Sequence, residues 1–252
     1  MWGIIPAAGA GTRIQPLAFS KELLPLCESA EGERRRPRAV SDYLVERLVL
    51  GGATKICFVI SPRKSDILEY YGGAVHSASV CYAVQPKPAG LCDAIFRALP
   101  VIGRDEPVIV GLPDTIWFPE TALQALPDSR LSFLLFPVED PRRFDAVVLD
   151  AQDRVKEIQV KSANPTSEWI WGAFKMPGHV LAELNDLWRA RGQLDEYIGT
   201  LVNAWLAGGE TAEGIRAGRS YFDVGTMDSY LDTMRILSTK DRQPASMPII
   251  ER

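Results

Sequence analysis

Residues 2–13 read Trp2-Gly-Ile-Ile-Pro-Ala-Ala-Gly-Ala-Gly-Thr-Arg13, a short apolar run that ends in a glycine-rich turn. Such a run is typical of a central parallel strand, and open α/β sheets bind ligands at the turns that follow their strands. Segments with helical spacing then alternate with strand-like segments as far as Leu112. This alternation predicts βαβ units and a mainly parallel sheet.

The elements expected in this first part are strands at residues 2–8, 55–61, 80–84 and 108–112 and helices at residues 39–50, 65–71 and 91–99. The charged segment from Glu28 to Arg38 is expected to be a solvated loop. Beyond Leu131, strand-like runs separated by short turns predict a more antiparallel insertion, at residues 131–137, 146–149, 155–160 and 169–174. Helical spacing returns at residues 179–190, 195–206 and 227–237. The predicted fold is α/β, a Rossmann-like three-layer α/β/α arrangement around a mixed, mainly parallel sheet.

Composition narrows the class of protein and of ligand. The 252 residues, 46% apolar and 24% charged, can bury a full core, and we expect one domain over residues 1–252. A net charge of −4 and a pI near 5.4 argue against nucleic acid as a partner. Neither an apolar run of roughly 20 residues nor a signal peptide is present, so we expect no membrane contact and a cytoplasmic location. Four cysteines without a CxxC pair and only two histidines argue against zinc and favour a hard cation on carboxylates.

The glycine-rich turn has to be tested against two known phosphate-binding loops. A dinucleotide fingerprint requires Gly or Ala where Ile14 stands, and Pro16 prevents an immediate long helix, which disfavours a nicotinamide-dependent oxidoreductase. No Gly-Lys-Ser/Thr closes the turn, so the Walker pattern also fails. What remains is a loop that can bring backbone N–H groups against phosphates, with Arg13 and Lys21 supplying positive charge.

Four motifs, in order along most of the chain, carry a resemblance to a known family. They are Pro6-Ala-Ala-Gly-Ala-Gly-Thr-Arg13 with Pro16 and Lys21-Glu-Leu-Leu-Pro25, then Gln85-Pro-Lys-Pro-Ala-Gly-Leu-Cys-Asp-Ala94, Leu112-Pro-Asp114 and Tyr221-Phe-Asp-Val-Gly-Thr226. Together they resemble the signature of the sugar-phosphate nucleotidyltransferases, and most of all the glucose-1-phosphate thymidylyl- and uridylyltransferases. The resemblance implies transfer of a nucleoside monophosphate from an NTP, with dTTP or UTP favoured, to a sugar 1-phosphate or similar phosphomonoester, releasing pyrophosphate.

The resemblance also implies roles for individual residues on the nucleotide side. The NTP would rest on the backbone of the glycine-rich turn, at Ala8, Gly9, Gly11 and Thr12. Arg13 would contact its phosphates, and Lys21 would neutralise charge near the α-phosphate as the second catalytic cation. Gln85 and Gly90 would bind the base, as relatives that select thymine or uracil do. Asp114 and Asp223 match the two carboxylates that hold Mg²⁺, the expected cofactor.

On the acceptor side the resemblance assigns Lys161 to the sugar phosphate and places Ala146 and Gly172 in the acceptor site. Residues 1–130 would form the nucleotide-binding part, residues 131–225 the acceptor-binding part, and residues 226–252 a C-terminal helix and tail. Relatives carry Glu-Lys-Pro where this chain has Val160-Lys161-Ser162, and a glycine where it has Ala146. We therefore expect an acceptor less like glucose, such as a deoxy, amino or cyclitol phosphate.

The chemistry itself requires such groups. Attack of one phosphate on another brings two polyanions together, so positioning and charge neutralisation supply most of the catalysis. A phosphomonoester, with a second pKa of about 6, is already dianionic near neutral pH and needs no general base. The alternative left open is a catalytically inactive, nucleotide-binding regulatory subunit of the same fold. Self-association into a homo-oligomer is implied by the resemblance alone.

Overall fold

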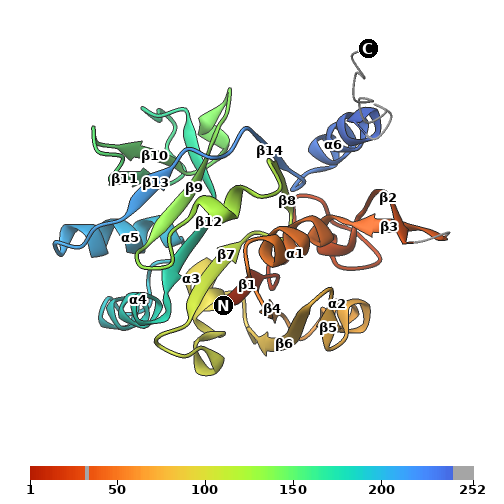
Figure 1. Cartoon of the computed structure of the whole chain (residues 1–252), viewed down its shortest axis with the longest axis horizontal. Coiled ribbons are helices and arrows are strands. Elements are labelled where there is room, and N and C mark those ends of the chain that lie inside the picture. The colour runs from red at the N-terminus through yellow and green to blue at the C-terminus, as the bar shows by residue number, and fades with distance from the viewer. Residues whose placement is uncertain (32–33, 241–252) are drawn as a thin grey trace, which may run out of the picture.

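The computed structural model describes residues 1–31 and 34–240 and is organised around a sheet with the strand order β11-β10-β12-β7-β1-β4-β6-β5 (Figure 1). Its parallel part consists of β1 (Trp2–Pro6), β4 (Lys55–Ile60), β6 (Ala78–Val84) and β7 (Pro107–Gly111). β1 pairs in parallel with both β4 and β7, and β4 pairs in parallel with β6. The predicted parallel core is therefore confirmed, with β1 near its centre and the glycine-rich loop at the carboxyl end of β1.

The second half of the chain extends this sheet with antiparallel strands. These are β9 (Ser132–Pro137), β10 (Ala146–Leu149), β11 (Val155–Gln159) and β12 (Trp169–Pro177). β12 runs antiparallel to β7 and so joins the two halves, while β13 (Glu213–Ile215) pairs in parallel with β9 and β5 (Ala74–Val75) forms the other edge beside β6. The expectation of a more antiparallel second part is confirmed.

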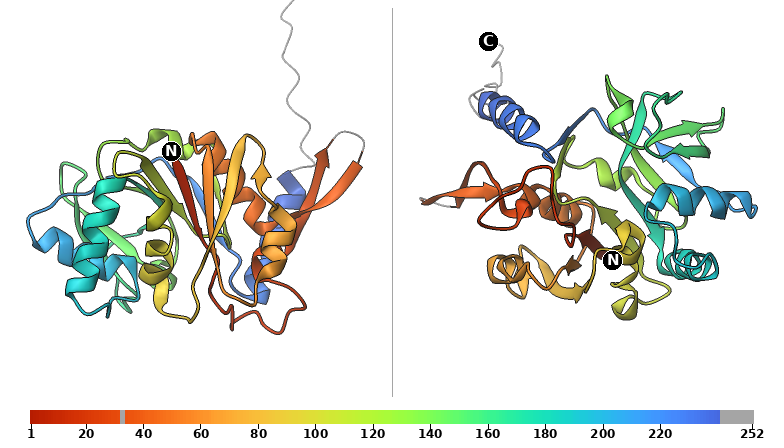
Figure 2. Two further views of the ribbon diagram at one scale, coloured as in Figure 1. Left: turned by 90° about the horizontal axis from the view of Figure 1, so that it is seen from below. Right: turned by 180° about the vertical axis from the view of Figure 1, so that it is seen from behind.

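Helices cover both faces of the sheet, as Figure 2 shows. One apolar cluster packs α1 (Val40–Leu50) and α2 (Ser65–Tyr71) against the sheet, and another packs α3 (Gly90–Phe96), α4 (Gly178–Ala190) and α5 (Ile198–Ala207). Four short 3-10 turns, η1 (Lys21–Leu23), η2 (Leu99–Val101), η3 (Ala122–Ala125) and η4 (Pro141–Arg143), lie in the connections. The three-layer arrangement is that predicted from the alternation of helical and strand-like patterns. Among the described residues, no helix has both the length and the apolar character needed to cross a membrane.

The expectation of a loop from Glu28 to Arg38 is wrong. β2 (Pro25–Glu31) and β3 (Arg34–Ala39) form an antiparallel ribbon in which Glu31 lies opposite Arg34. Backbone hydrogen bonds hold such a ribbon, so it needs no alternation of apolar and polar residues. α6 (Met227–Lys240) contacts this ribbon, and the Tyr230 hydroxyl donates to the Pro25 carbonyl at 2.7 Å.

A second small sheet was also not predicted, and it positions the site. β8 (Thr115–Phe118) pairs antiparallel with β14 (Ser220–Asp223), with Thr115 opposite Asp223. The Val224 N–H donates to the Asp114 carbonyl at 2.8 Å and continues this pairing. Two motifs far apart in the sequence therefore meet at the end of the second sheet.

Candidate active site

The glycine-rich loop leaves β1 with its backbone donors free. The Ala7 N–H still donates to the Val59 carbonyl at 2.8 Å, and the Ile14 N–H donates to the Gly11 carbonyl at 3.1 Å. Between them, no described residue accepts a hydrogen bond from the N–H groups of residues 9–13. Gly11 has φ +64°, a left-handed conformation that glycine adopts without strain, and a Cβ at Gly9 would meet nothing within 4 Å. The loop therefore offers unpaired N–H groups and open space, which is the arrangement that binds phosphate.

Lys21 stands against this loop and reaches across to β8. Its Nζ donates to Asp114 Oδ2 at 2.5 Å, and both side chains are only 14% exposed. Burial opposes charge on either group, but their mutual attraction outweighs it, so the pKa of Lys21 is raised and the pKa of Asp114 is lowered. A Cβ at Gly11 would lie 2.9 Å from Lys21 Cδ, so the glycine lets the loop approach the lysine closely. The pair is charged and close to the free N–H groups.

Asp223 comes to the same place through β14. Burial raises its pKa, and the negative charge of Asp114 raises it further. Arg13 arrives from the loop: a Cβ at Gly225 would lie 2.7 Å from Arg13 Nη2 and 3.0 Å from Asp223 Oδ1. Arg13, Lys21, Asp114 and Asp223, the two cations and two carboxylates singled out in the sequence, therefore converge at one place.

The two carboxylates fit a hard divalent cation. Among the residues that the structure describes, none donates a hydrogen bond to the Asp223 side chain. The nearby carboxylate of Asp114 adds a second negative charge at the same place. Carboxylate oxygens are the ligands that Mg²⁺ prefers. The described residues contain no group of three or more His, Cys, Asp or Glu side chains suited to a metal. A cation at Asp114 and Asp223 would therefore complete its shell with water and substrate oxygens, as Mg²⁺ commonly does.

A cavity of about 270 Å³ opens beside this cluster. Charged residues from both halves of the chain line it, namely Lys21, Glu22, Asp114, Asp145 and Lys161. Gly9 and four aromatic residues also line it, the aromatic ones being Phe144, Trp171, Tyr197 and Tyr221. Lys161 therefore faces the same space as Lys21 and Asp114. Its own backbone has φ +48°, which is unusual for a residue other than glycine.

Ala146 and Gly172 do not line this cavity, although both were predicted to be in the acceptor site. Ala146 is fully buried, and a Cβ at Gly172 would lie 2.5 Å from a ring carbon of Phe136 and 2.7 Å from one of Tyr221. The residues that precede them in the sequence, Asp145 and Trp171, line the cavity. Gly172 therefore allows the rings of Phe136 and Tyr221 to pack closely against β12.

Gln85 is held in one orientation by two residues of its own motif, Gly90 and Asp93. Its Nε2 donates to Asp93 Oδ2 at 2.8 Å and to the Gly90 carbonyl at 3.1 Å. Both partners can only accept, so the Gln85 amide nitrogen must face them and its Oε1 must face away. Gly90 has φ +84°, and a Cβ there would lie 2.6 Å from Glu196 Cα. The glycine is therefore required by close approach of the Glu196 backbone.

Comparison with known proteins decides the family. The family model described as nucleotidyl transferase matches residues 2–240. The chain belongs to the nucleotidyl transferase family. It is 28% identical to the glucose-1-phosphate thymidylyltransferase of Neisseria meningitidis over 95% of this chain and 83% of that protein. It is equally similar, 28% over 95% and 83%, to the enzyme of that name from Mycolicibacterium smegmatis.

Solved structures agree on the fold. A UTP-bound UGPase from Acinetobacter baumannii superposes with a TM-score of 0.78 at 19% identity, covering 96% of this chain and 94% of that one. A putative glucose-1-phosphate thymidylyltransferase from Bacillus anthracis, in complex with a sucrose, gives 0.75 at 24% identity over 93% and 94%. The resemblance read from the four motifs is confirmed, and the chain is a nucleotidyltransferase rather than a nicotinamide-dependent oxidoreductase.

A buried ion pair in this nucleotidyltransferase has no signal in the sequence. Lys64 Nζ donates to both carboxylate oxygens of Glu22, at 2.7 and 2.8 Å, and to the Ala7 carbonyl at 2.7 Å. The three groups belong to the turn after β4, the η1 segment and the end of β1. The pair therefore ties the start of the glycine-rich loop to the segment that carries Lys21.

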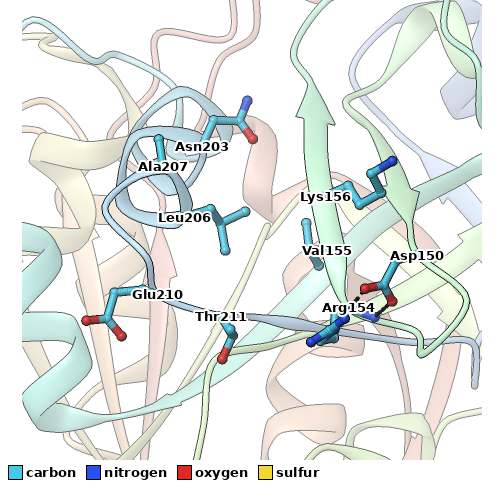
Figure 3. A pocket seen from close by; sticks show the side chains of 9 residues that line it. All are labelled: Asp150, Arg154, Val155, Lys156, Asn203, Leu206, Ala207, Glu210 and Thr211. Atoms are coloured by element: carbon cyan, nitrogen blue, oxygen red, sulfur yellow. Dashed lines mark hydrogen bonds and ion pairs between the residues drawn. The ribbon is translucent and has the colours of Figure 1, made fainter.

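Two further cavities differ in their position relative to the candidate site. One of about 880 Å³ is lined by Ala8 and Ala10 of the loop together with residues 61–66 and 86–88. The other, of about 320 Å³, lies between α5 and β11 and is drawn in Figure 3. It is lined by Arg154, Lys156, Asn203 and their neighbours, and none of the residues predicted for the site lines it. The larger of the two therefore adjoins the candidate site, and the other is separate from it.

Proposed function

We propose that this nucleotidyltransferase transfers a nucleoside monophosphate from dTTP or UTP to a sugar 1-phosphate or a similar ring-shaped phosphomonoester and releases pyrophosphate. The observation that carries the proposal is the convergence of the unpaired loop N–H groups, Arg13, Lys21, Asp114 and Asp223 beside a cavity that also contains Lys161. The substrate class is that of the similar proteins, which are glucose-1-phosphate thymidylyltransferases.

The reaction needs two anions to approach and one to leave. An oxygen of the acceptor phosphate forms a bond to the α-phosphorus, and the bond from that phosphorus to the oxygen bridging to the β-phosphate breaks, so pyrophosphate leaves with the electron pair. The loop N–H groups and Arg13 bind the oxygens of the triphosphate, and Lys21 neutralises charge at the α-phosphate. Lys161 holds the phosphate of the acceptor. No side chain has to remove a proton, because the acceptor phosphate is already dianionic near neutral pH.

Asp114 and Asp223 are the residues proposed to hold Mg²⁺. The bound cation would add positive charge where the phosphates meet. Two properties of the chain support this: the oxygen-only donor set, and the raised pKa of Asp223, which records burial and the repulsion between the two carboxylates. Lys21, paired with Asp114, keeps one of these carboxylates ionised and aligned.

The orientation of Gln85 supports thymine or uracil as the base. With its nitrogen committed to Asp93 and Gly90, Gln85 can only accept a hydrogen bond from a base, through Oε1. Thymine and uracil carry an N–H at the position where cytosine has a bare acceptor nitrogen. An acceptor oxygen thus favours the first two and leaves a buried mismatch with cytosine.

The proposal is tested by incubating the purified chain with each of dTTP, UTP, CTP, ATP and GTP against a panel of phosphorylated sugars and cyclitols, with pyrophosphate detection. We expect release with dTTP or UTP and at least one acceptor, and loss of release when EDTA is added and its recovery when excess Mg²⁺ follows. Absence of pyrophosphate release from every pair in the presence of Mg²⁺ would show that the chain lacks this activity.

A further inference from the structure

Asp145 is a buried carboxylate in the wall of the 270 Å³ cavity, and neither the sequence motifs nor the proposed reaction gives it a role. Its side chain is 7% exposed. The two other carboxylates in that wall each have a close cation: Asp114 has Lys21 at 2.5 Å and Glu22 has Lys64 at 2.7 Å. Among the described residues, Asp145 forms an ion pair only with Lys161, whose Nζ lies 3.6 Å away, beyond ordinary hydrogen-bond length.

The two oxygens of Asp145 are used differently. Oδ1 accepts the Lys161 N–H at 3.1 Å and is also the oxygen nearest to Lys161 Nζ. Within the described part of the chain, no group donates a hydrogen bond to Oδ2. A carboxylate with this degree of burial normally has both oxygens satisfied. Asp145 therefore presents an unused acceptor to the cavity.

Binding of the acceptor phosphate leaves Asp145 with still fewer hydrogen-bond and charge partners. The Lys161 side chain is 55% exposed and its contact with Asp145 is long, so it can turn toward a phosphate. Of the donors in the described part of the chain, Asp145 would then keep the backbone N–H of Lys161 alone. Oδ2 is not among the fully buried atoms without a partner, so it is open to the cavity. When the acceptor displaces water from the cavity, this oxygen is destabilised unless the ligand supplies a donor.

We propose that Asp145 determines acceptor specificity by accepting, through Oδ2, a hydrogen bond from a hydroxyl or ammonium group on the ring of the acceptor. This inference rests on the proposed function, because it takes the ligand of the cavity to be the phosphorylated acceptor. The aromatic side chains of Phe144, Trp171 and Tyr221 give the same cavity apolar walls for a ring. The ligand is then a ring-shaped phosphomonoester with one donor substituent placed against Asp145.

The size of the effect follows from the charge on the partner. A hydrogen bond to a charged group contributes enough that removing the donor from the ligand lowers kcat/KM by about 10- to 100-fold. The loss occurs only for the substituent that faces Asp145. It requires the carboxylate, so it disappears when the carboxylate is removed.

The experiment compares the best acceptor with its complete set of monodeoxy analogues, using the wild-type chain, Asp145→Ala, Asp145→Asn and the control Asp153→Asn. Asp153 is an exposed residue of the turn before β11 that pairs with Arg216. We expect one deoxy analogue to lose about 10- to 100-fold in kcat/KM with the wild type and with the control, but less than about threefold with Asp145→Ala. The KM for the NTP stays unchanged in all four proteins, which a general loss of structure would not allow.

A further arm separates the two donor types. The analogue with an amine in place of the hydroxyl at the same carbon is tested with Asp145→Asn, whose amide oxygen still accepts from a hydroxyl but has no charge for an ammonium. If Asp145→Asn lowers kcat/KM for the amine analogue only, the natural donor is an ammonium group. If kcat/KM is retained for both the hydroxyl acceptor and the amine analogue, the natural donor is a hydroxyl group. If each deoxy analogue lost the same fraction of kcat/KM with the wild type as with Asp145→Ala, the role of Asp145 would be overturned and the proposed function would stand. Absence of pyrophosphate release by the wild type with every acceptor would instead overturn the proposed function, and this role with it.

Discussion

The orientation of Gln85 leads to a prediction about base selection. In the structure, turning the Gln85 amide over would place its oxygen against Asp93 Oδ2, where Nε2 now donates at 2.8 Å. That change forfeits a hydrogen bond to a charged group, about 1.5–3 kcal/mol, so the wrong orientation is about 10- to 100-fold disfavoured. Asp93→Asn removes most of this preference because an asparagine side chain can donate as well as accept. The Gly90 carbonyl, at 3.1 Å, still favours the original orientation.

We therefore expect Asp93→Asn to lower the ratio of kcat/KM for UTP over CTP, or dTTP over dCTP, by about 10-fold rather than to abolish it. The measurement is steady-state pyrophosphate release at several concentrations of each nucleotide. Asp93 also forms an ion pair with Arg97, which is 45% exposed. Arg97→Gln removes that pair and keeps the carboxylate, so this control should retain the wild-type ratio. An unchanged ratio in Asp93→Asn, or an equal fall in Arg97→Gln, would refute the reasoning.

Three further predictions concern catalysis, stability and thiol chemistry. Asp114→Asn and Asp223→Asn should each lower kcat at saturating Mg²⁺ by about 100-fold or more, measured by pyrophosphate release, with the far-UV circular dichroism spectrum retained. Lys64→Met leaves the buried Glu22 carboxylate without its cation and should lower the free energy of unfolding in urea by about 3–5 kcal/mol. Burial raises the pKa of Cys92 from 9.0 to about 12, so iodoacetamide should not label this thiol at pH 8.5 unless urea is added. The stability linked to this thiol is present below pH 9 and is lost as the pH rises toward 12.

Each of these has an outcome that contradicts it. Near-normal kcat in both aspartate variants would mean that the metal site is elsewhere. A Glu22→Gln, Lys64→Met double variant should recover part of the lost stability, and a double variant no more stable than Lys64→Met would argue against an uncompensated charge as the cause. Rapid labelling of Cys92 in the native chain, measured by peptide mass spectrometry, would show that this thiol is accessible and not protected by the fold.

Local patterns were sufficient for the framework of the fold. Strands such as Lys55–Ile60 and helices such as Ser65–Tyr71 were predicted within a residue or two, because apolar periodicity records which face of an element is buried. The ribbon at residues 25–39 was missed, because charged residues can pair through their backbones without leaving such a record. β8 and β14 were also missed, and their pairing joins segments that lie far apart in the sequence.

The four motifs were sufficient to identify the family and to single out the glycine-rich loop and the charged residues near it, because glycines and charges in a fixed local order are visible without coordinates. The packing of the strands was needed to show that Asp145 lies in the cavity wall and that Ala146 and Gly172 do not, because the surroundings of a side chain depend on the elements packed against its strand. Only the structure brought Asp93 to Gln85 and Lys64 to Glu22. These contacts join separate elements, and their distances are set by the packing of the sheet and not by spacing along the chain.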